Sequence, residues 1–173
     1  MVTENYKKYL DQAKKVHLSG HWPGGSLKGH IPAINEIIKT KEIKTALDYG
    51  CGKAKFHPTE WTSFFTKYDP GYPLYEARPT GTFDLVICTD VMEHIPEDSV
   101  EYVINDLFSY AKKHLYVNIC TREATQKLPN GENAHVTVKP EKWWNSIFEN
   151  ISQNYPGVEF DVIFYDPKKE KFR

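Results

Sequence analysis

The stretch ALDYGCGKAKF, residues 46–56, decides the fold, because it runs from a strand pattern directly into a glycine turn. Its first four residues are apolar or aromatic except for Asp48, which is typical of a short buried strand. Gly50 and Gly52 have no Cβ and therefore let the backbone pass close to a ligand. A plain chain reversal is the alternative interpretation of the two glycines, so other parts of the sequence have to decide.

Segments of strand length alternate with helical patterns along the rest of the chain. Residues 83–90 (FDLVICTD) and 114–120 (HLYVNIC) are nearly continuous apolar runs, the pattern of strands covered on both faces of a parallel sheet. The remaining segments are shorter or more polar. Strands are expected at 44–49, 66–69 and 158–165, and helices at 4–17, from Pro32 through Ile38, at 61–65, at 96–113 and from Pro140 to 151.

This alternation predicts one α/β domain with a doubly wound, mostly parallel sheet and helices on both faces. Residues 1–40 form its N-terminal helical segment, and residues 44–165 form its α/β core. In open sheets of this type, ligands bind outside the carboxyl ends of the strands. The glycine turn, Asp69, Asp90 and Cys120 all lie at such ends.

The composition narrows the classes of partner. Of the 173 residues 40% are hydrophobic, which predicts a globular chain, and the net charge of −1 predicts no nucleic-acid partner. No apolar run approaches the roughly 20 residues that cross a bilayer, and the polar N-terminus lacks the apolar core of a signal peptide. Three widely spaced cysteines indicate reduced thiols, so we expect a cytoplasmic protein without a membrane partner.

Asp69 stands where a ribose-binding acid is expected. It follows Asp48 at close to the roughly 20-residue spacing of the ribose-binding acid in dinucleotide folds. A carboxylate only accepts hydrogen bonds, which suits the two hydroxyls of a ribose. The alternative interpretation is a turn aspartate before Pro70, a common arrangement.

Three segments together carry a resemblance to a known family. They are LDYGCGK after the first strand, an acid that ends the second strand (YDP), and FDLVICTDVMEHI at a later strand. Together they resemble the class I S-adenosylmethionine-dependent methyltransferases. The similarity spans about residues 44–120 and implies S-adenosylmethionine as the cofactor. In that family the glycine turn approaches the amino-acid end of the cofactor, and the strand-two acid accepts from both ribose hydroxyls. The resemblance assigns cofactor binding to Asp48, Gly50, Cys51, Gly52, Asp69, Pro70, Asp90 and Val91.

The chain departs from the family pattern at three places. Ala54 stands where the third family glycine is usual. The strand-three region, residues 75–81, is short. One strand is expected from residue 158 on, whereas the family fold usually ends in two. We therefore expect a trimmed version of the fold. A nicotinamide-dependent enzyme is a weaker alternative, because Lys55 stands at the third glycine of the G-x-G-x-x-G pattern.

The resemblance places His94 near the reacting methyl group. Methyl transfer is largely a matter of positioning, and a base is needed only if the acceptor must lose a proton. His94 is therefore the candidate catalytic residue, with a structural histidine as the alternative. Residues 121–138 are expected to form a hairpin that acts as a substrate lid, because long loops at this face are often functional. Arg122 and His135 in that loop are the candidate substrate-binding residues.

The predicted function is methyl transfer from S-adenosylmethionine to a small molecule or sugar-like polar group. The alternative is a non-catalytic S-adenosylmethionine-binding protein with a regulatory or assembly role. Neither the D/N-P-P-Y motif nor the Pro-Cys nucleophile of DNA methyltransferases is present.

No metal site is predicted from the cysteines. Cys51, Cys88 and Cys120 lie near the ends of neighbouring expected strands, and His94 would be the fourth ligand of a zinc ion. However, the chain has no C-x-x-C pair, and a buried cysteine usually packs as a small apolar side chain.

Overall fold

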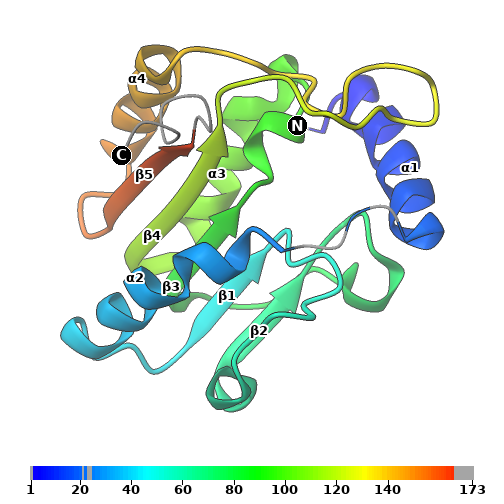
Figure 1. The fold of residues 1–173 in the computed structure, drawn as a ribbon. Helices are drawn as coiled ribbons and strands as arrows, with labels where there is room; N and C mark the ends of the chain where they lie inside the picture. The colour runs from blue at the N-terminus through cyan, green and yellow to red at the C-terminus, as the bar shows by residue number, and fades with distance from the viewer. Residues whose placement is uncertain (1, 21, 23–24, 166–173) are drawn as a thin grey trace, which may run out of the picture.

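The computed structural model describes residues 2–20, 22 and 25–165. The charged tail after residue 165 lies outside the described residues, and so does part of the HWPGGS loop, which the sequence suggests either closes over the cofactor or only connects two helices. Five strands form one all-parallel sheet in the order β2-β1-β3-β4-β5 (Figure 1). They are β1 (Ala46–Tyr49), β2 (Phe65–Tyr68), β3 (Phe83–Thr89), β4 (Ala111–Cys120) and β5 (Glu159–Tyr165).

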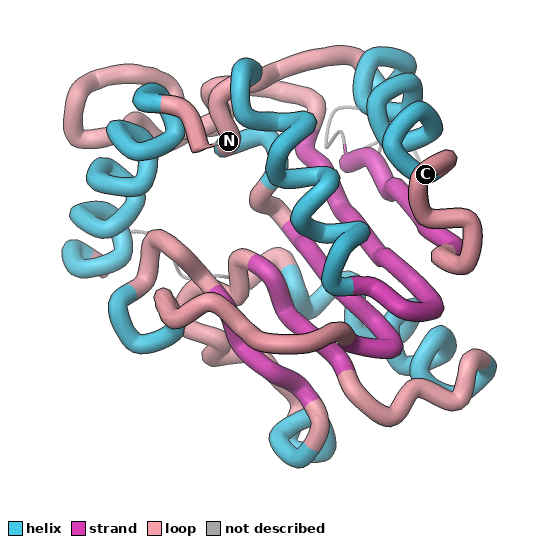
Figure 2. The backbone as a smooth tube through the Cα atoms, turned by 180° about the vertical axis from the view of Figure 1, so that it is seen from behind, coloured by secondary structure: helices cyan, strands magenta, loops and turns pink. Residues whose placement is uncertain are grey.

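Helices cover both faces of the sheet, as a doubly wound α/β fold requires. In Figure 1, α2 lies in front of the sheet, and in Figure 2, seen from behind, α3 crosses in front of it. The fold class is confirmed, and the architecture is compatible with a Rossmann-like fold. The α-helices are α1 (Glu4–Ser19), α2 (Leu27–Thr40), α3 (Val100–Tyr110) and α4 (Glu141–Ser152); the 3₁₀ turns are η1 (Thr59–Ser63), η2 (Pro73–Tyr75), η3 (Met92–His94) and η4 (Glu97–Ser99).

The apolar run of β3 is explained by burial on both faces. Leu85 and Ile87 belong to the core beneath α2, whereas Val86 and Cys88 belong to the core beneath α3 and α4. All four side chains are fully buried. Because successive side chains of a strand point to opposite faces, a strand covered twice must be apolar at every position.

Two helix boundaries differ from the sequence-based expectation. α2 begins at Leu27, so Pro32 lies inside the helix rather than in its first turn. Leu27, the first residue of α2, is buried in the core between α2 and the sheet, which accounts for the earlier start, although proline removes one backbone hydrogen bond. The helix expected to reach residue 113 ends at Tyr110, because Ala111 already pairs with Phe83 in the sheet. The short helix after the glycine turn is a 3₁₀ turn, η1.

The prediction of a two-stranded hairpin at residues 121–138 is wrong. A single antiparallel bridge joins Lys127 and Asn133, and the rest of the segment is irregular. Leu128 and Ala134 are instead buried against Val16 of α1. The loop is therefore docked on α1 by apolar contacts that its polar composition does not reveal.

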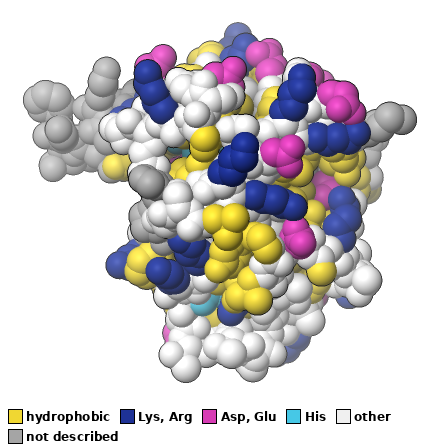
Figure 3. Space-filling view, turned by 90° about the vertical axis from the view of Figure 1, so that its right-hand side faces the viewer, with side chains coloured by type: hydrophobic (Ala, Val, Ile, Leu, Met, Phe, Trp, Pro, Cys, Tyr) yellow, Lys and Arg dark blue, Asp and Glu magenta, His cyan; other side chains and the backbone are white. Residues whose placement is uncertain are grey.

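The described surface offers mixed charge on the face shown in Figure 3, where basic and acidic side chains are interspersed. Among the described residues, no helix is both long enough and apolar enough to cross a bilayer. All three cysteines are free and buried.

Candidate functional site

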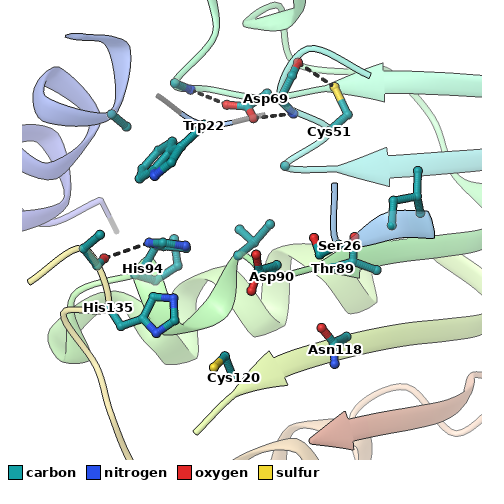
Figure 4. A pocket seen from close by; sticks show the side chains of 18 of the residues that line it. Trp22, Ser26, Cys51, Asp69, Thr89, Asp90, His94, Asn118, Cys120 and His135 are labelled. Carbon is teal, nitrogen blue, oxygen red and sulfur yellow. Dashed lines mark hydrogen bonds between the residues drawn. The ribbon is translucent and has the colours of Figure 1, made fainter. Parts of the chain in front are cut away.

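A cavity of about 830 Å³ lies at the carboxyl ends of β1 to β4, between the sheet, α1 and the loop after β4 (Figure 4). Every residue that the sequence assigns to cofactor binding, catalysis or substrate binding lines this cavity, which brings the glycine turn and the loop after β4 to one place. These residues are Asp48, Gly50, Cys51, Gly52, Asp69, Pro70, Asp90, Val91, His94, Arg122 and His135.

The glycine turn is held in a left-handed conformation. Gly50 has φ 80°, and a Cβ there would lie 2.4 Å from Cγ2 of Val91. Close packing against Val91 therefore requires glycine at this position whether or not a ligand also approaches the backbone there. Ala54, at the place of the third family glycine, also has positive φ, 48°, although it carries a Cβ.

Asp69 fastens the glycine turn to the end of β2. Its Oδ2 accepts a hydrogen bond from the Gly52 N–H at 2.7 Å, and its Oδ1 accepts from the Gly71 N–H at 2.8 Å. His17 Nε2 lies 3.7 Å from Oδ2. Burial raises the pKa of Asp69, and His17 and the two backbone donors oppose that rise. The bond to Gly71 is that of a turn aspartate, although the side chain is buried rather than exposed as the turn interpretation expects, and the ribose interpretation stays open.

Asp48 has a partner that the sequence did not indicate. Its Oδ2 lies 2.6 Å from Nε2 of His57, and only 4% and 5% of the two side chains is exposed. His57 lies nine residues beyond Asp48, in the irregular segment that follows the glycine turn. No spacing or motif marks His57, because the contact arises only when that segment folds back over β1.

The contacts of His94 determine its tautomer. It ends η3, directly after β3, and its Nδ1 lies 2.7 Å from the carbonyl oxygen of Ala134. A carbonyl only accepts, so Nδ1 carries the hydrogen and Nε2 keeps a lone pair in the neutral ring. Burial, and next the neighbouring His135, lower the pKa of His94 to about 4. His94 is thus a neutral imidazole near pH 7.

Aromatic rings surround His94 on the cavity wall. The ring of Trp22 lies 5.0 Å from it and that of His135 lies 4.8 Å from it, between centroids (Figure 4). Trp22 also meets His17 at 5.0 Å, so one indole contacts both histidines. Trp22 lies in the HWPGGS loop and lines the cavity, in keeping with the expectation that this loop closes over the site, although no motif singles out Trp22 itself.

The two candidate substrate residues lie side by side. His135 Nδ1 donates to the carbonyl oxygen of Arg122 at 2.6 Å, which leaves His135 Nε2 without a proton in the neutral ring. Arg122 Nε is buried and has no hydrogen-bond partner. The Asn133 side chain accepts from the Ala124 and His135 N–H groups and donates to the Ala124 carbonyl. This asparagine sets the shape of the loop around both residues.

Glu93 is a fully buried acid beneath the cavity. Its Oε1 accepts from the Cys120 N–H at 2.8 Å, and its Oε2 has no hydrogen-bond partner. Burial, followed by the charge of Asp90, raises the pKa of Glu93 well above its usual range. Among the described residues, the group with metal-ligand proximity is Glu93, Cys120 and His135, which does not include Cys51, Cys88 or His94.

Comparisons of the chain with protein-family models, with curated proteins and with solved structures found no match. The geometry of the cavity is therefore the basis for the function proposed below.

Proposed function

We propose that the chain is an S-adenosylmethionine-dependent methyltransferase acting on a small molecule or a sugar-like polar group. The observation that carries the proposal is the shared cavity: the glycine turn, Asp69 and the neutral His94 all line it. At about 830 Å³ it lies toward the upper end of the roughly 300–1,000 Å³ range of small-molecule sites, which favours a donor and an acceptor together.

The carboxylate of Asp69 retains the capacity that a ribose needs. An ionised carboxylate offers about four lone-pair sites, and the two backbone N–H groups use one on each oxygen. Two acceptor sites remain for two hydroxyls. The turn at Gly50 and Gly52 would hold the amino-acid end of the cofactor, and Asp90 and Val91 would flank it. All four residues line the cavity.

S-Adenosylmethionine supplies an electrophilic methyl group when it is bound. The chain's contribution is to position the acceptor and to remove its proton. His94 Nε2, which carries a lone pair because Nδ1 donates to Ala134, accepts that proton from an acceptor hydroxyl or amine. Arg122 and His135 would orient a polar acceptor from the loop after β4.

Titration calorimetry tests the cofactor. We expect S-adenosylmethionine and S-adenosylhomocysteine to bind in the micromolar range, about −7 to −9 kcal/mol. Heat with a nicotinamide dinucleotide and none with either sulfur ligand would overturn the proposal.

A transfer assay then separates an enzyme from a binder. Protein incubated with methyl-labelled S-adenosylmethionine and panels of metabolites and glycans should transfer label to one class of acceptor. The His94→Gln variant should bind the cofactor with similar affinity but transfer label roughly 100-fold more slowly, within the usual range for a lost general base. Tight cofactor binding without transfer to any acceptor would favour the non-catalytic binder instead.

A further inference from the structure

Three potential ligands converge below the cavity from three separate segments. Glu93 comes from η3, Cys120 is the last residue of β4, and His135 comes from the loop after β4. One ligating atom of each lies within 4.8 Å of the others. We propose that Glu93, Cys120 and His135 form a binding site for one Zn²⁺ ion, with a fourth coordination position open to the cavity.

Two of the three side chains leave a ligand atom available, and Cys120 Sγ makes only a long contact, 4.0 Å, with the Arg122 carbonyl oxygen. Glu93 uses Oε1 to accept from the Cys120 N–H, and its buried Oε2 receives no N–H donor and faces the carboxyl of Asp90. His135 donates from Nδ1 to the Arg122 carbonyl and leaves Nε2 free. Ligating histidines usually donate their second nitrogen to a carbonyl or carboxylate in this way, which fixes the ring and its tautomer. The independent observation is this buried carboxyl oxygen, which has no N–H donor and faces a second carboxyl, so that either a shared proton or a bound cation must satisfy it.

The donor set selects zinc. One thiolate, one imidazole and one carboxylate are the three ligand types that Zn²⁺ accepts, whereas Mg²⁺ and Ca²⁺ prefer oxygen alone. Zinc bound at about 2.0–2.3 Å places neighbouring tetrahedral ligands about 3.4–3.6 Å apart. The three atoms must therefore approach one another by up to about 1 Å, through small shifts of the side chains when the ion binds.

The open position follows from burial. Cys120 and His135 line the cavity, whereas Glu93 is fully buried beneath them. An ion held by all three therefore has its uncoordinated side toward the cavity, which is the arrangement of catalytic rather than structural zinc sites. The inference goes beyond the proposed function and does not depend on S-adenosylmethionine. It assigns Nε2 of His135 to the ion, so that with zinc bound Arg122 would contact the acceptor directly and His135 would act on it through the metal.

Metal titration of the full chain tests the site. Protein stripped with a chelator should take up one Zn²⁺ per chain in calorimetry, and Co²⁺ in its place should give a thiolate-to-metal charge-transfer band. An absence of stoichiometric uptake would overturn the proposal, and it would leave the carboxyl of Glu93 to share a proton with Asp90.

Matched variants assign the ligands. Cys120→Ser should abolish the charge-transfer band, and His135→Gln and Glu93→Gln should each lose stoichiometric uptake. Glu93→Gln keeps the oxygen that accepts from Cys120, so it tests the charge with little change of shape. Cys51→Ser, at another cavity-lining cysteine outside the group, should bind as the parent does. Unchanged uptake in His135→Gln, a partly exposed loop residue whose folding circular dichroism can verify, would contradict the site.

Discussion

Ala54 carries backbone strain that a glycine would relieve. An L-residue in the left-handed region loses roughly 1–2 kcal/mol, and Ala54 has φ 48° there. Ala54→Gly should raise the free energy of unfolding by about 0.5–1 kcal/mol, because the greater freedom of glycine in the unfolded chain offsets part of the gain. Urea unfolding followed by circular dichroism measures the change.

The control for Ala54 is Ala33→Gly in the exposed part of α2. There the same substitution should lower the free energy of unfolding by about 0.5–1 kcal/mol, because φ is already helical. Equal signs at the two positions would show that the conformation of Ala54 is not strained.

Replacing Asp69 separates its contribution to stability from the proposed contribution to cofactor binding. The sequence predicts a residue at the surface of the crevice, whose replacement leaves folding nearly unchanged, and the structure contradicts that expectation. Asp69→Ala leaves the buried N–H groups of Gly52 and Gly71 without acceptors, so we expect about 2–4 kcal/mol lower stability. If it also binds ribose, affinity for the cofactor should fall roughly 30- to 1000-fold.

The matched variant for this prediction is Asp69→Asn, which keeps one acceptor oxygen and should lose less of both quantities. Stability comes from urea unfolding and affinity from calorimetry on the same preparations. A destabilised Asp69→Ala protein that still binds S-adenosylmethionine with parental affinity would limit Asp69 to the turn.

At the scale of elements, one side chain, Asn133, makes three of the hydrogen bonds within the loop after β4. Asn133→Ala removes three hydrogen bonds to the backbone of Ala124 and His135. The amides of Ala124 and His135 should then exchange with solvent about 10-fold or more faster, which corresponds to roughly 1–3 kcal/mol of lost local stability. Hydrogen exchange read by mass spectrometry or NMR measures this.

Asn133→Asp is the control for the loop, because it keeps both acceptor contacts and loses only the donor to the Ala124 carbonyl. Its exchange rates should lie between those of the parent and Asn133→Ala. Rapid exchange of these amides already in the parent chain would show a mobile lid, as the polar composition of residues 121–138 suggests.

At the scale of the whole molecule, a buried histidine makes stability depend on pH. Burial lowers the pKa of His114, although Asp161, whose Oδ2 lies 2.9 Å from its Nε2, opposes that shift. Below about pH 6.5 the unfolded chain takes up a proton that the folded chain does not, so this contribution is present above pH 6.5 and lost on acidification. Lys41 and Glu159 are the other charges near the ring.

Removing the titrating group should make the free energy of unfolding depend less on pH below about pH 6.5. We expect His114→Gln to lose less stability than the parent between pH 7 and pH 5 in urea unfolding, since glutamine does not titrate. His17 and His30, whose pKa values burial also lowers, keep part of the slope in the variant. A steeper acid loss in the variant than in the parent would contradict the sign.

The sequence by itself determined the fold class and the location of the cavity. A nearly continuous apolar run such as residues 83–90 predicts a strand that is buried on both faces, and this pattern can be recognised from consecutive residues alone. Asp69 and the glycine turn were likewise predictable, because topology places every strand end of a parallel sheet at one edge.

Only the tertiary structure decided which side chains meet at that edge. The pairing of Asp48 with His57, the docking of Leu128 on α1 and the convergence of Glu93, Cys120 and His135 join residues without any periodic spacing. Such contacts depend on how irregular segments close over the sheet, where many chain paths are compatible with one composition. Long-range packing and the satisfaction of buried polar atoms select one of these paths, and local pattern does not contain that choice.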